Sequence, residues 1–300
     1  MAKEVGILRN QELVQVACVF VDDPSGKNTG GSPFSALYVL RLAKMVNRFL
    51  LLPHRFVAYC DWKSRSVLES AVDFFTKLGA LRDHRNPGKN IEIEVVELMN
   101  PYEEKISFRD AFFHWPGWWS KINMFSPHKE RLFYLDLDTI IVGRIDNLVS
   151  CPEKFVVLDD FYYQGKVGSG LMLIHPGAAE EVWGIFVQNP TRWMESLRGD
   201  QDFIEKVCGT EDGRVKGVKR WQHLFPGRVV SYKVDCVGKN FGRVPGGAEV
   251  VCFHGTPRPH EVAGRVSWVS ERWLQTIGSS GSVGGVGSGM GDVKNTGKGD

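Results

Sequence analysis

The sequence predicts an α/β fold, with a mostly parallel central sheet flanked by helices. Apolar runs typical of strands alternate with segments of helical spacing through most of the 300 residues, and such alternation is typical of a parallel sheet. No linker-like segment interrupts residues 1–277, so we expect one domain there. Residues 278–300 contain nine glycines and no aromatic side chain. That composition buries too little apolar surface to fold, so we expect a disordered tail.

The strands are predicted from short apolar runs, in chain order. VQVACVFV at 14–21 is apolar almost throughout, which is typical of a buried strand. IEIEVVEL at 91–98 begins with alternating polar and apolar residues, which indicates a half-buried strand. RLFYLDLDTIIVG at 131–143 is interpreted as one buried strand with two aspartates in its middle. We predict the remaining strands at 54–61, 154–160, 168–175 and 248–255.

The helices are predicted from apolar residues that recur at helical spacing. The clearest case is 34–50, which follows a glycine-rich segment at 22–33. That segment lacks the spacing of a phosphate-binding loop, so we interpret its core, SGKNTGG at 25–31, as a flexible surface loop. Residues 209–247 carry no pattern that predicts a regular element. We predict the other helices at 66–80, 117–127, 178–188 and 199–208.

The composition limits the classes of function. The 37 basic and 35 acidic residues give a formal net charge of +2, so nothing favours a nucleic-acid partner or a membrane surface. No apolar run is long enough to span a membrane, and the N-terminus lacks a signal-peptide pattern. The six cysteines are scattered and form no CxxC pair. We therefore expect reduced thiols and a cytoplasmic protein.

Two aspartates, Asp136 and Asp138, stand inside the apolar run 131–143. In an extended strand they would share one face, with Cα atoms roughly 7 Å apart. Two carboxylates so close repel each other and are costly to desolvate, and a divalent cation with a preference for oxygen ligands, Mn²⁺ or Mg²⁺, would remove both problems. The alternative is that they cap the strand end or pair with Arg131 or Arg144.

Other residues whose side chains could bind a ligand or take part in a reaction lie far from this pair in the sequence. VVCFHGTPRPHE at 250–261 brings His254 to a strand end, followed by Gly255 and Arg258. The imidazole could complete a metal site, the glycine would let the backbone approach a phosphate, and the guanidinium could bind a diphosphate. Lys121 lies on the predicted helix before the aspartates, although it could simply extend from a helix packed by tryptophans. Asp200, Gln201 and Asp202 stand at a helix start, where Asp200 could equally be an N-cap.

These motifs occur in the order YLDLDTIIV, VGSGLMLIH, RGDQDFI and FHGTPRPHE. Together they resemble the nucleotide-sugar glycosyltransferases of the GT-A fold, in particular family 8, the group around glycogenin and the bacterial galactosyltransferases. GWWSKINMF resembles the aromatic and lysine segment before the DxD motif in related sequences. The resemblance covers about residues 14 to 275 and implies a GT-A (Rossmann-like) fold.

The resemblance also implies an activity: metal-dependent transfer of a hexose from a nucleotide diphosphate sugar, a UDP-hexose, to a glycan or other hydroxyl acceptor, with retention at the anomeric carbon. It implies Asp136, Asp138 and His254 as ligands of Mn²⁺ (or Mg²⁺), and Asp200, Gln201 and Asp202 as candidates for the catalytic position. Tyr38 is implied to stack on the base. The implied donor-binding residues are Val19, Phe20, Val21, Tyr38, Lys121, Asp136, Leu137, Gly255 and Arg258.

The sequence departs from the family pattern at two places. Gly168 stands where the family's NSG motif has an amide, and Arg258-Pro259-His260 replaces KPW; both leave the sugar open. Three other functions remain: a haloacid-dehalogenase-type phosphohydrolase, a glycosidase, and an inactive module that binds sugar nucleotides or glycans. The first lacks its expected Thr or Val at Ile140 and its last Asp at Ile204, and the second needs carboxylates on both sides of a sugar. Trp115, Trp118 and Trp119 could line an acceptor cleft or pack in the core.

Overall fold

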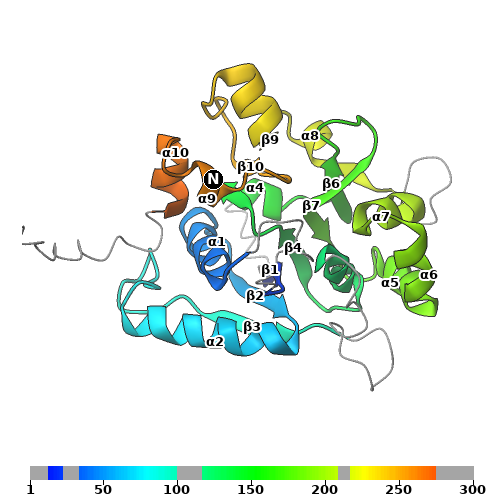
Figure 1. Cartoon of the computed structure of the whole chain (residues 1–300), viewed down its shortest axis with the longest axis horizontal. Coiled ribbons are helices and arrows are strands. Elements are labelled where there is room, and N and C mark those ends of the chain that lie inside the picture. Colours follow the sequence, from blue (N-terminus) through cyan, green and yellow to red (C-terminus); the bar gives the residue numbers. More distant parts are fainter. Residues whose placement is uncertain (1–12, 23–33, 100–116, 209–216, 275–300) are drawn as a thin grey trace, which may run out of the picture.

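The computed structural model describes residues 13–22, 34–99, 117–208 and 217–274. The expected tail at 278–300, the loop at 25–31 and Trp115 lie outside these residues. A seven-stranded sheet in the order β3-β2-β1-β4-β7-β6-β8 forms the centre, and a three-stranded sheet in the order β5-β10-β9 lies beside it (Figure 1). In the larger sheet β7 runs antiparallel to β4 and β6, and the other pairs are parallel. The predicted α/β fold with a mostly parallel sheet is confirmed.

The elements have the following bounds. The strands are β1 (Val14–Phe20), β2 (His54–Cys60), β3 (Ile93–Glu97), β4 (Arg131–Leu135), β5 (Thr139–Ile141), β6 (Phe155–Asp159), β7 (Val167–Ile174), β8 (Lys219–Arg220), β9 (Val229–Ser231) and β10 (Val250–Cys252). The α-helices are α1 (Ala36–Phe49), α2 (Trp62–Lys77), α4 (Asp146–Val149), α5 (Glu180–Gln188), α6 (Pro190–Ser196), α7 (Asp200–Cys208), α8 (Trp221–Leu224), α9 (Pro259–Val262) and α10 (Ser267–Val269). A 3₁₀ helix, η1 (Gly117–Phe125), and two π-helical segments, η2 (Tyr232–Lys239) and η3 (Ser270–Leu274), complete the described part.

Strand β1 lies in the middle of the sheet and shows how alternation builds two cores. Val16, Cys18 and Phe20 point to one face and pack in a cluster with residues of α1. Ala17 and Val19 point to the other face, where a second cluster includes residues of η1, α5 and α7. Helices therefore cover both faces, and Figure 1 shows α1 and α2 on one side of the strands and α5 to α7 on the other.

The segment 131–143 is not one strand, and this prediction was wrong. Strand β4 ends at Leu135, and the amide of Thr139 donates to the carbonyl of Asp136 at 3.1 Å, which closes a tight turn. Strand β5 then joins the smaller sheet, antiparallel to β10. The two aspartates therefore lie on a turn between two sheets, where carboxylates can face a cavity, rather than on one face of a continuous strand.

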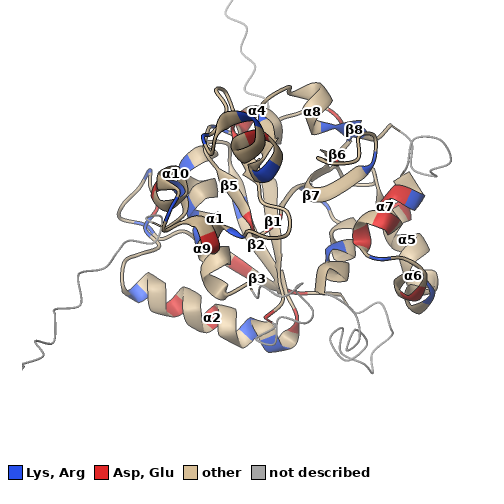
Figure 2. Cartoon of the chain, turned by 45° about the horizontal axis from the view of Figure 1, so that its top comes forward, with Lys and Arg blue, Asp and Glu red and all other residues tan. Residues whose placement is uncertain are grey.

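The remaining expectations about composition can be compared with the described residues. All six cysteines are free and buried, as predicted for reduced thiols. Figure 2 shows residues of both charges on α2 and α7, in keeping with the balanced composition. In the described part of the chain, no helix combines the length and the hydropathy that crossing a bilayer would require.

Candidate active site

A cavity of about 890 Å³ opens where β1 and β4 end. These are the carboxyl ends of neighbouring parallel strands, which is where α/β sheets bind their ligands. Residues from η1, the turn after β4, the start of α7 and the segment after β10 all reach it. The predicted site residues that line it are Val19, Val21, Lys121, Asp136, Leu137, Asp138, Asp200, Gln201, Asp202, His254, Gly255 and Arg258.

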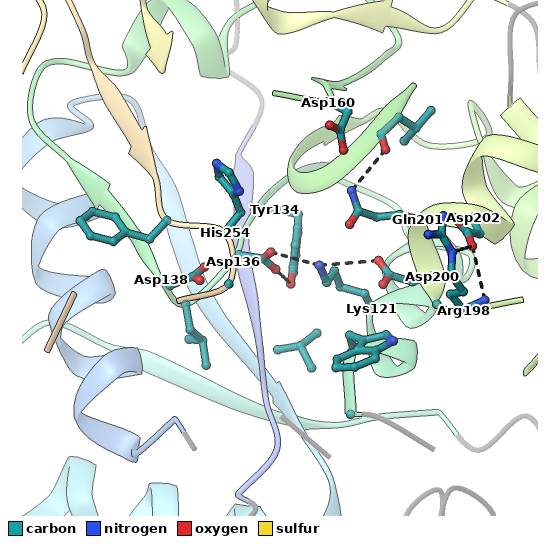
Figure 3. Close-up of a pocket in the computed structure, with 18 of the residues that line it drawn as sticks. Lys121, Tyr134, Asp136, Asp138, Asp160, Arg198, Asp200, Gln201, Asp202 and His254 are labelled. Atoms are coloured by element: carbon teal, nitrogen blue, oxygen red, sulfur yellow. Dashed lines mark hydrogen bonds and ion pairs between the residues drawn. The ribbon is translucent and has the colours of Figure 1, made fainter. Parts of the chain in front are cut away.

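The ammonium group of Lys121 lies at the centre of this cavity between two carboxylates. Its Nζ is 3.0 Å from Oδ2 of Asp136, 3.1 Å from Oγ of Ser169 and 3.6 Å from Oδ2 of Asp200 (Figure 3). The hydroxyl of Ser169 in turn donates to Asp200 at 2.6 Å. Burial alone would lower the pKa of Lys121, but Asp136 and Asp200 raise it above its ordinary value. The lysine is therefore a permanent positive charge in the cavity.

Asp136 has a second partner that sequence reasoning missed. The hydroxyl of Tyr134 donates to Oδ1 of Asp136 at 2.6 Å, while Lys121 binds Oδ2. Burial and the nearby carboxylate both raise the pKa of Tyr134, so its hydroxyl stays protonated. The sequence feature that could have indicated this contact is the two-residue spacing of Tyr134 and Asp136, because alternate side chains lie on one side of a strand.

Asp138 is paired with Arg258, from the other end of the domain sequence. The guanidinium of Arg258 donates to Oδ2 of Asp138, which is 3% exposed. Burial raises the pKa of Asp138, and the positive charge of Arg258 opposes that rise. The same guanidinium lies over the ring of Phe34, 4.7 Å from its centroid. The alternative of a local pair with Arg131 or Arg144 is not observed, since Arg131 donates to the carbonyl of Val149 and Arg144 binds Asp146.

His254 lines the same cavity but is held by other residues. Its Nε2 lies 2.7 Å from Oγ of Ser231, and its ring stacks on Phe161 with centroids 5.2 Å apart. Burial lowers the pKa of His254 to about 4, so the imidazole is neutral, the form that can bind a metal.

The kinds of side chain that line the cavity suit a divalent cation, because they include two carboxylates and a neutral imidazole. Within the described residues, however, no group of three or more His, Cys, Asp or Glu side chains is close enough to hold an ion. Arg258 and Lys121 neutralise the two aspartates in this arrangement. A cation at these side chains would therefore need Arg258 to leave Asp138.

Two predicted donor-binding residues lie away from the cavity. Phe20 is fully buried in the core, because strand alternation turns it away from Val19 and Val21. Tyr38 is 3% exposed, and its hydroxyl is 2.5 Å from Nδ1 of His260. Its ring packs against Trp273, with centroids 4.9 Å apart. The position of Tyr38 corrects the expectation that its ring is available to stack on a base.

The start of α7 contributes three polar side chains with different partners. Asp200 is buried beside Lys121, and burial raises its pKa although Lys121 opposes the rise. The amide of Gln201 donates to the carbonyl of Val167 at 3.2 Å. Asp202 accepts two hydrogen bonds from the guanidinium of Arg198, at 2.8 and 3.0 Å. Asp200 and Gln201 face the interior of the cavity (Figure 3), whereas Asp202 forms an ion pair at its rim.

The two described tryptophans before the aspartates lie in different environments. Trp118 lines the cavity and is 36% exposed, whereas Trp119 is fully buried and packs on Phe186. Of these two tryptophans, one therefore lines the cavity and the other packs in the core.

Solved structures provide the comparison for this architecture. The galactosyltransferase LgtC, in complex with donor and acceptor sugar analogs, matches with a TM-score of 0.54 and 14% identity, over 88% of this chain and 95% of that one. The chain has the GT-A fold. The bifunctional glycosyltransferase WbbM matches with a TM-score of 0.50 and 10% identity, over 91% of this chain and 53% of that one. No protein-family model matches the sequence, and no curated protein does. At these identities the likeness establishes the fold alone.

Proposed function

We propose that this protein is a glycosyltransferase that moves a hexose from a nucleoside diphosphate sugar, a UDP-hexose, to an acceptor hydroxyl with retention of configuration. The observation that carries the proposal is the cavity at the carboxyl ends of β1 and β4 in a GT-A fold. It combines two cationic side chains with a cluster of buried carboxylates. Such a cavity can receive a diphosphate and a sugar side by side.

Arg258 and Lys121 would oppose the negative charge that develops on the leaving diphosphate. Arg258 can move from Asp138 to the phosphate oxygens, where a guanidinium forms strong charge-assisted hydrogen bonds. Lys121 is fixed by Asp136, Ser169 and Asp200, so its charge is already oriented before the substrate arrives. Preoriented charges of this kind commonly contribute a barrier reduction of about 3 kcal/mol each.

Asp200 and Gln201 are the candidates for contact with the sugar. Asp200 is held by Ser169 and Lys121, and Gln201 by the carbonyl of Val167. In this proposal their oxygen atoms orient the sugar hydroxyls and face the positive charge that builds up at the anomeric carbon. Val19, Val21 and Leu137 would form the apolar wall for the nucleoside, which their position in the cavity supports.

Asp136, Asp138 and His254 are the residues that would hold Mn²⁺ or Mg²⁺. A bound divalent cation supplies Lewis-acid neutralisation of the diphosphate. The side chains of the protein have the remaining roles in this proposal. Arg258 and Lys121 bind and orient the diphosphate, and Tyr134 keeps Asp136 in position through its hydroxyl.

The test is a panel of nucleotide sugars with and without Mn²⁺, measuring release of nucleoside diphosphate by slow hydrolysis. We expect release from a UDP-hexose that depends on the metal and falls at least about a hundredfold in Asp138→Asn. Asp73→Asn is the matched control, because Asp73 lies exposed on α2 in an ion pair with Lys77. Proton NMR of the transfer product reports whether the anomeric configuration is retained.

The same panel separates the alternatives. Metal-independent binding of free sugar without turnover would identify an inactive binding module. Phosphate release from p-nitrophenyl phosphate would identify a phosphohydrolase. If Asp138→Asn turned over the donor like the parent, the assignment of this cavity as the active site would be wrong.

A further inference from the structure

The lining of the cavity includes a second group of residues besides the cluster of Lys121 and Asp200. Val19, Val21, Asp138 and Arg258 line the cavity, and so do two aromatic residues, Trp118 and Tyr163. The group that contains these aromatic residues also has charged residues of both signs. Its further lining residues are Lys166, Leu197, Arg198, Asp202 and Glu205.

Trp118 lies on the same helix as Lys121, and both line the cavity. It stands three residues before Lys121 in η1, and in a 3₁₀ helix side chains three residues apart lie one above the other. The two are separated by one turn, about 6 Å along the helix axis. The edge of the indole rests on Gly199, where an added Cβ would lie 2.7 Å from Nε1 of Trp118. The glycine therefore permits an approach that fixes the ring beside Asp200.

Tyr163 projects from a turn that is itself well ordered by hydrogen bonds. The carboxylate of Asp160 accepts from the amides of Tyr162 and Tyr163, both at 2.8 Å. The amide of Gly165 donates to Asp159 at 2.7 Å, and Gly165 has a φ of +86°, which glycine adopts without strain. The turn leaves Tyr163 68% exposed, although it is a large aromatic side chain. This exposure gives no benefit to the fold, because the ring buries little surface there.

We propose that Trp118 and Tyr163 form an acceptor subsite that binds a pyranose ring of a saccharide. Pyranose rings present C–H groups on their faces and hydroxyl groups around their edge. Aromatic faces match the former, and charged side chains match the latter. The edge partners are Arg198 and Asp202, which line the same cavity and already form an ion pair with two hydrogen bonds at 2.8 and 3.0 Å. The proposal rests on the proposed function, since it places the acceptor next to the proposed donor site.

The rim argues against an apolar acceptor. An acyl chain would take water away from Lys166, Arg198 and Glu205 without offering hydrogen bonds, which is costly for charged groups. The hydroxyls of a sugar would replace that water bond for bond. The acceptor class that fits the lining is therefore a saccharide, and a hydroxyl on a lipid or a peptide would be the contrary outcome.

The test is saturation-transfer difference NMR on the full chain with methyl β-galactoside, methyl β-glucoside, lactose and maltose. We expect ring-proton signals from at least one of these sugars. Tyr163→Ala should weaken that binding by about three- to tenfold, the range of an aromatic contact. Tyr163→Phe should keep it, because the ring rather than the hydroxyl makes the contact. Phe74→Ala is the matched control, since Phe74 is 57% exposed on α2 and does not line the cavity.

Kinetics then separate this proposal from the proposed function. Tyr163→Ala and Trp118→Ala should raise KM for the sugar acceptor about three- to tenfold, whereas Phe74→Ala should leave both that KM and kcat for donor hydrolysis unchanged. Absence of sugar signals, or equal signals in Tyr163→Ala and the parent, would overturn the subsite even if donor hydrolysis is seen. The opposite outcome is also informative. If the sugar signals depend on Tyr163 but the protein hydrolyses no nucleotide sugar, the saccharide site is supported and the proposed transferase function is wrong.

Discussion

The guanidinium of Arg258 binds the carboxylate of Asp138, although 120 residues separate them in the chain. Both side chains are nearly inaccessible, with 13% and 5% exposure. A buried ionised carboxylate without a cation is strongly disfavoured, so Asp138 stays ionised only while a positive charge lies beside it. Arg258 fills that role here, and a divalent cation would be its competitor.

This competition predicts the behaviour of Arg258→Gln. The variant leaves Asp138 unpaired, so its free energy of unfolding should fall by about 3 kcal/mol in the absence of metal. Mn²⁺ should then raise its Tm more than that of the parent, because binding no longer displaces a guanidinium. Thermal unfolding with and without Mn²⁺ measures both effects. Arg144→Gln, which removes a more exposed partner of Asp146, is the control, and an equal Tm gain in parent and Arg258→Gln would contradict the competition.

Lys121→Met should be among the most destabilising changes in the cavity. The variant leaves Asp136 and Asp200 facing each other without their shared cation, at a cost of about 3–5 kcal/mol. Adding Asp200→Asn should recover part of that loss, since one of the two charges is removed. Denaturant unfolding measures the free energies.

The comparison for this prediction is Lys77→Met on the surface of α2. Lys77 is 74% exposed in its pair with Asp73, and such pairs contribute only about 0.2–1 kcal/mol. Equal losses in Lys121→Met and Lys77→Met would mean that the buried charge cluster does not form.

Two glycine-to-alanine changes should alter the free energy of unfolding in opposite directions. A Cβ at Gly168 in β7 would lie 2.9 Å from Cβ of Leu158, whereas a Cβ at Gly184 in α5 meets nothing within 4 Å. Gly168→Ala should therefore cost about 1–3 kcal/mol through overpacking. Gly184→Ala should stabilise the protein by up to about 1 kcal/mol, because alanine favours the helix. Urea unfolding of the two variants measures both free energies. An unchanged free energy of unfolding in Gly168→Ala would show that β6 and β7 separate easily.

The buried thiols predict a slow reaction with thiol reagents over an unusual pH range. All six cysteines are buried, and burial raises the pKa of Cys60, Cys208 and Cys236 to about 12. Because the thiolate is the reactive form, labelling of the folded chain should be slow at about pH 8 and should still rise about tenfold per pH unit up to about pH 10, whereas an ordinary cysteine with a pKa of about 8.5 levels off in that range. Ellman's reagent should titrate all six thiols after denaturation, and a fast-reacting thiol in the folded chain would show that one of them is accessible.

Periodicity was sufficient to predict the elements with strong patterns. The helix predicted at 34–50 is α1, and the strands predicted at 14–21 and 54–61 are β1 and β2. The helix predicted at 66–80 begins earlier, at Trp62, because Asp61 accepts a hydrogen bond from the amide of Ser64 and caps it. That cap residue was visible in the sequence, but the apolar spacing that was followed begins later.

The candidate site was predictable in its residues but not in its contacts. The order of the motifs indicated Asp136, Asp138 and Arg258, yet only the sheet topology decides that Arg258 meets Asp138. The break of 131–143 into two strands was also hidden, because both halves are apolar and periodicity does not mark a change of sheet. Tyr134 and Ser169 are chemically ordinary in sequence, and their importance follows from the buried charges that they contact.

The antiparallel pairing of β5 with β10 has a practical consequence for redesign. Thr139 directly follows Asp138 and pairs with Cys252, two residues before His254. Inserting or deleting one residue in either strand would slip the register and turn alternate side chains over. Libraries that vary the candidate site should therefore keep 139–141 and 250–252 unchanged and draw their diversity from exposed lining residues of the turn after β6, such as Tyr163 and Lys166.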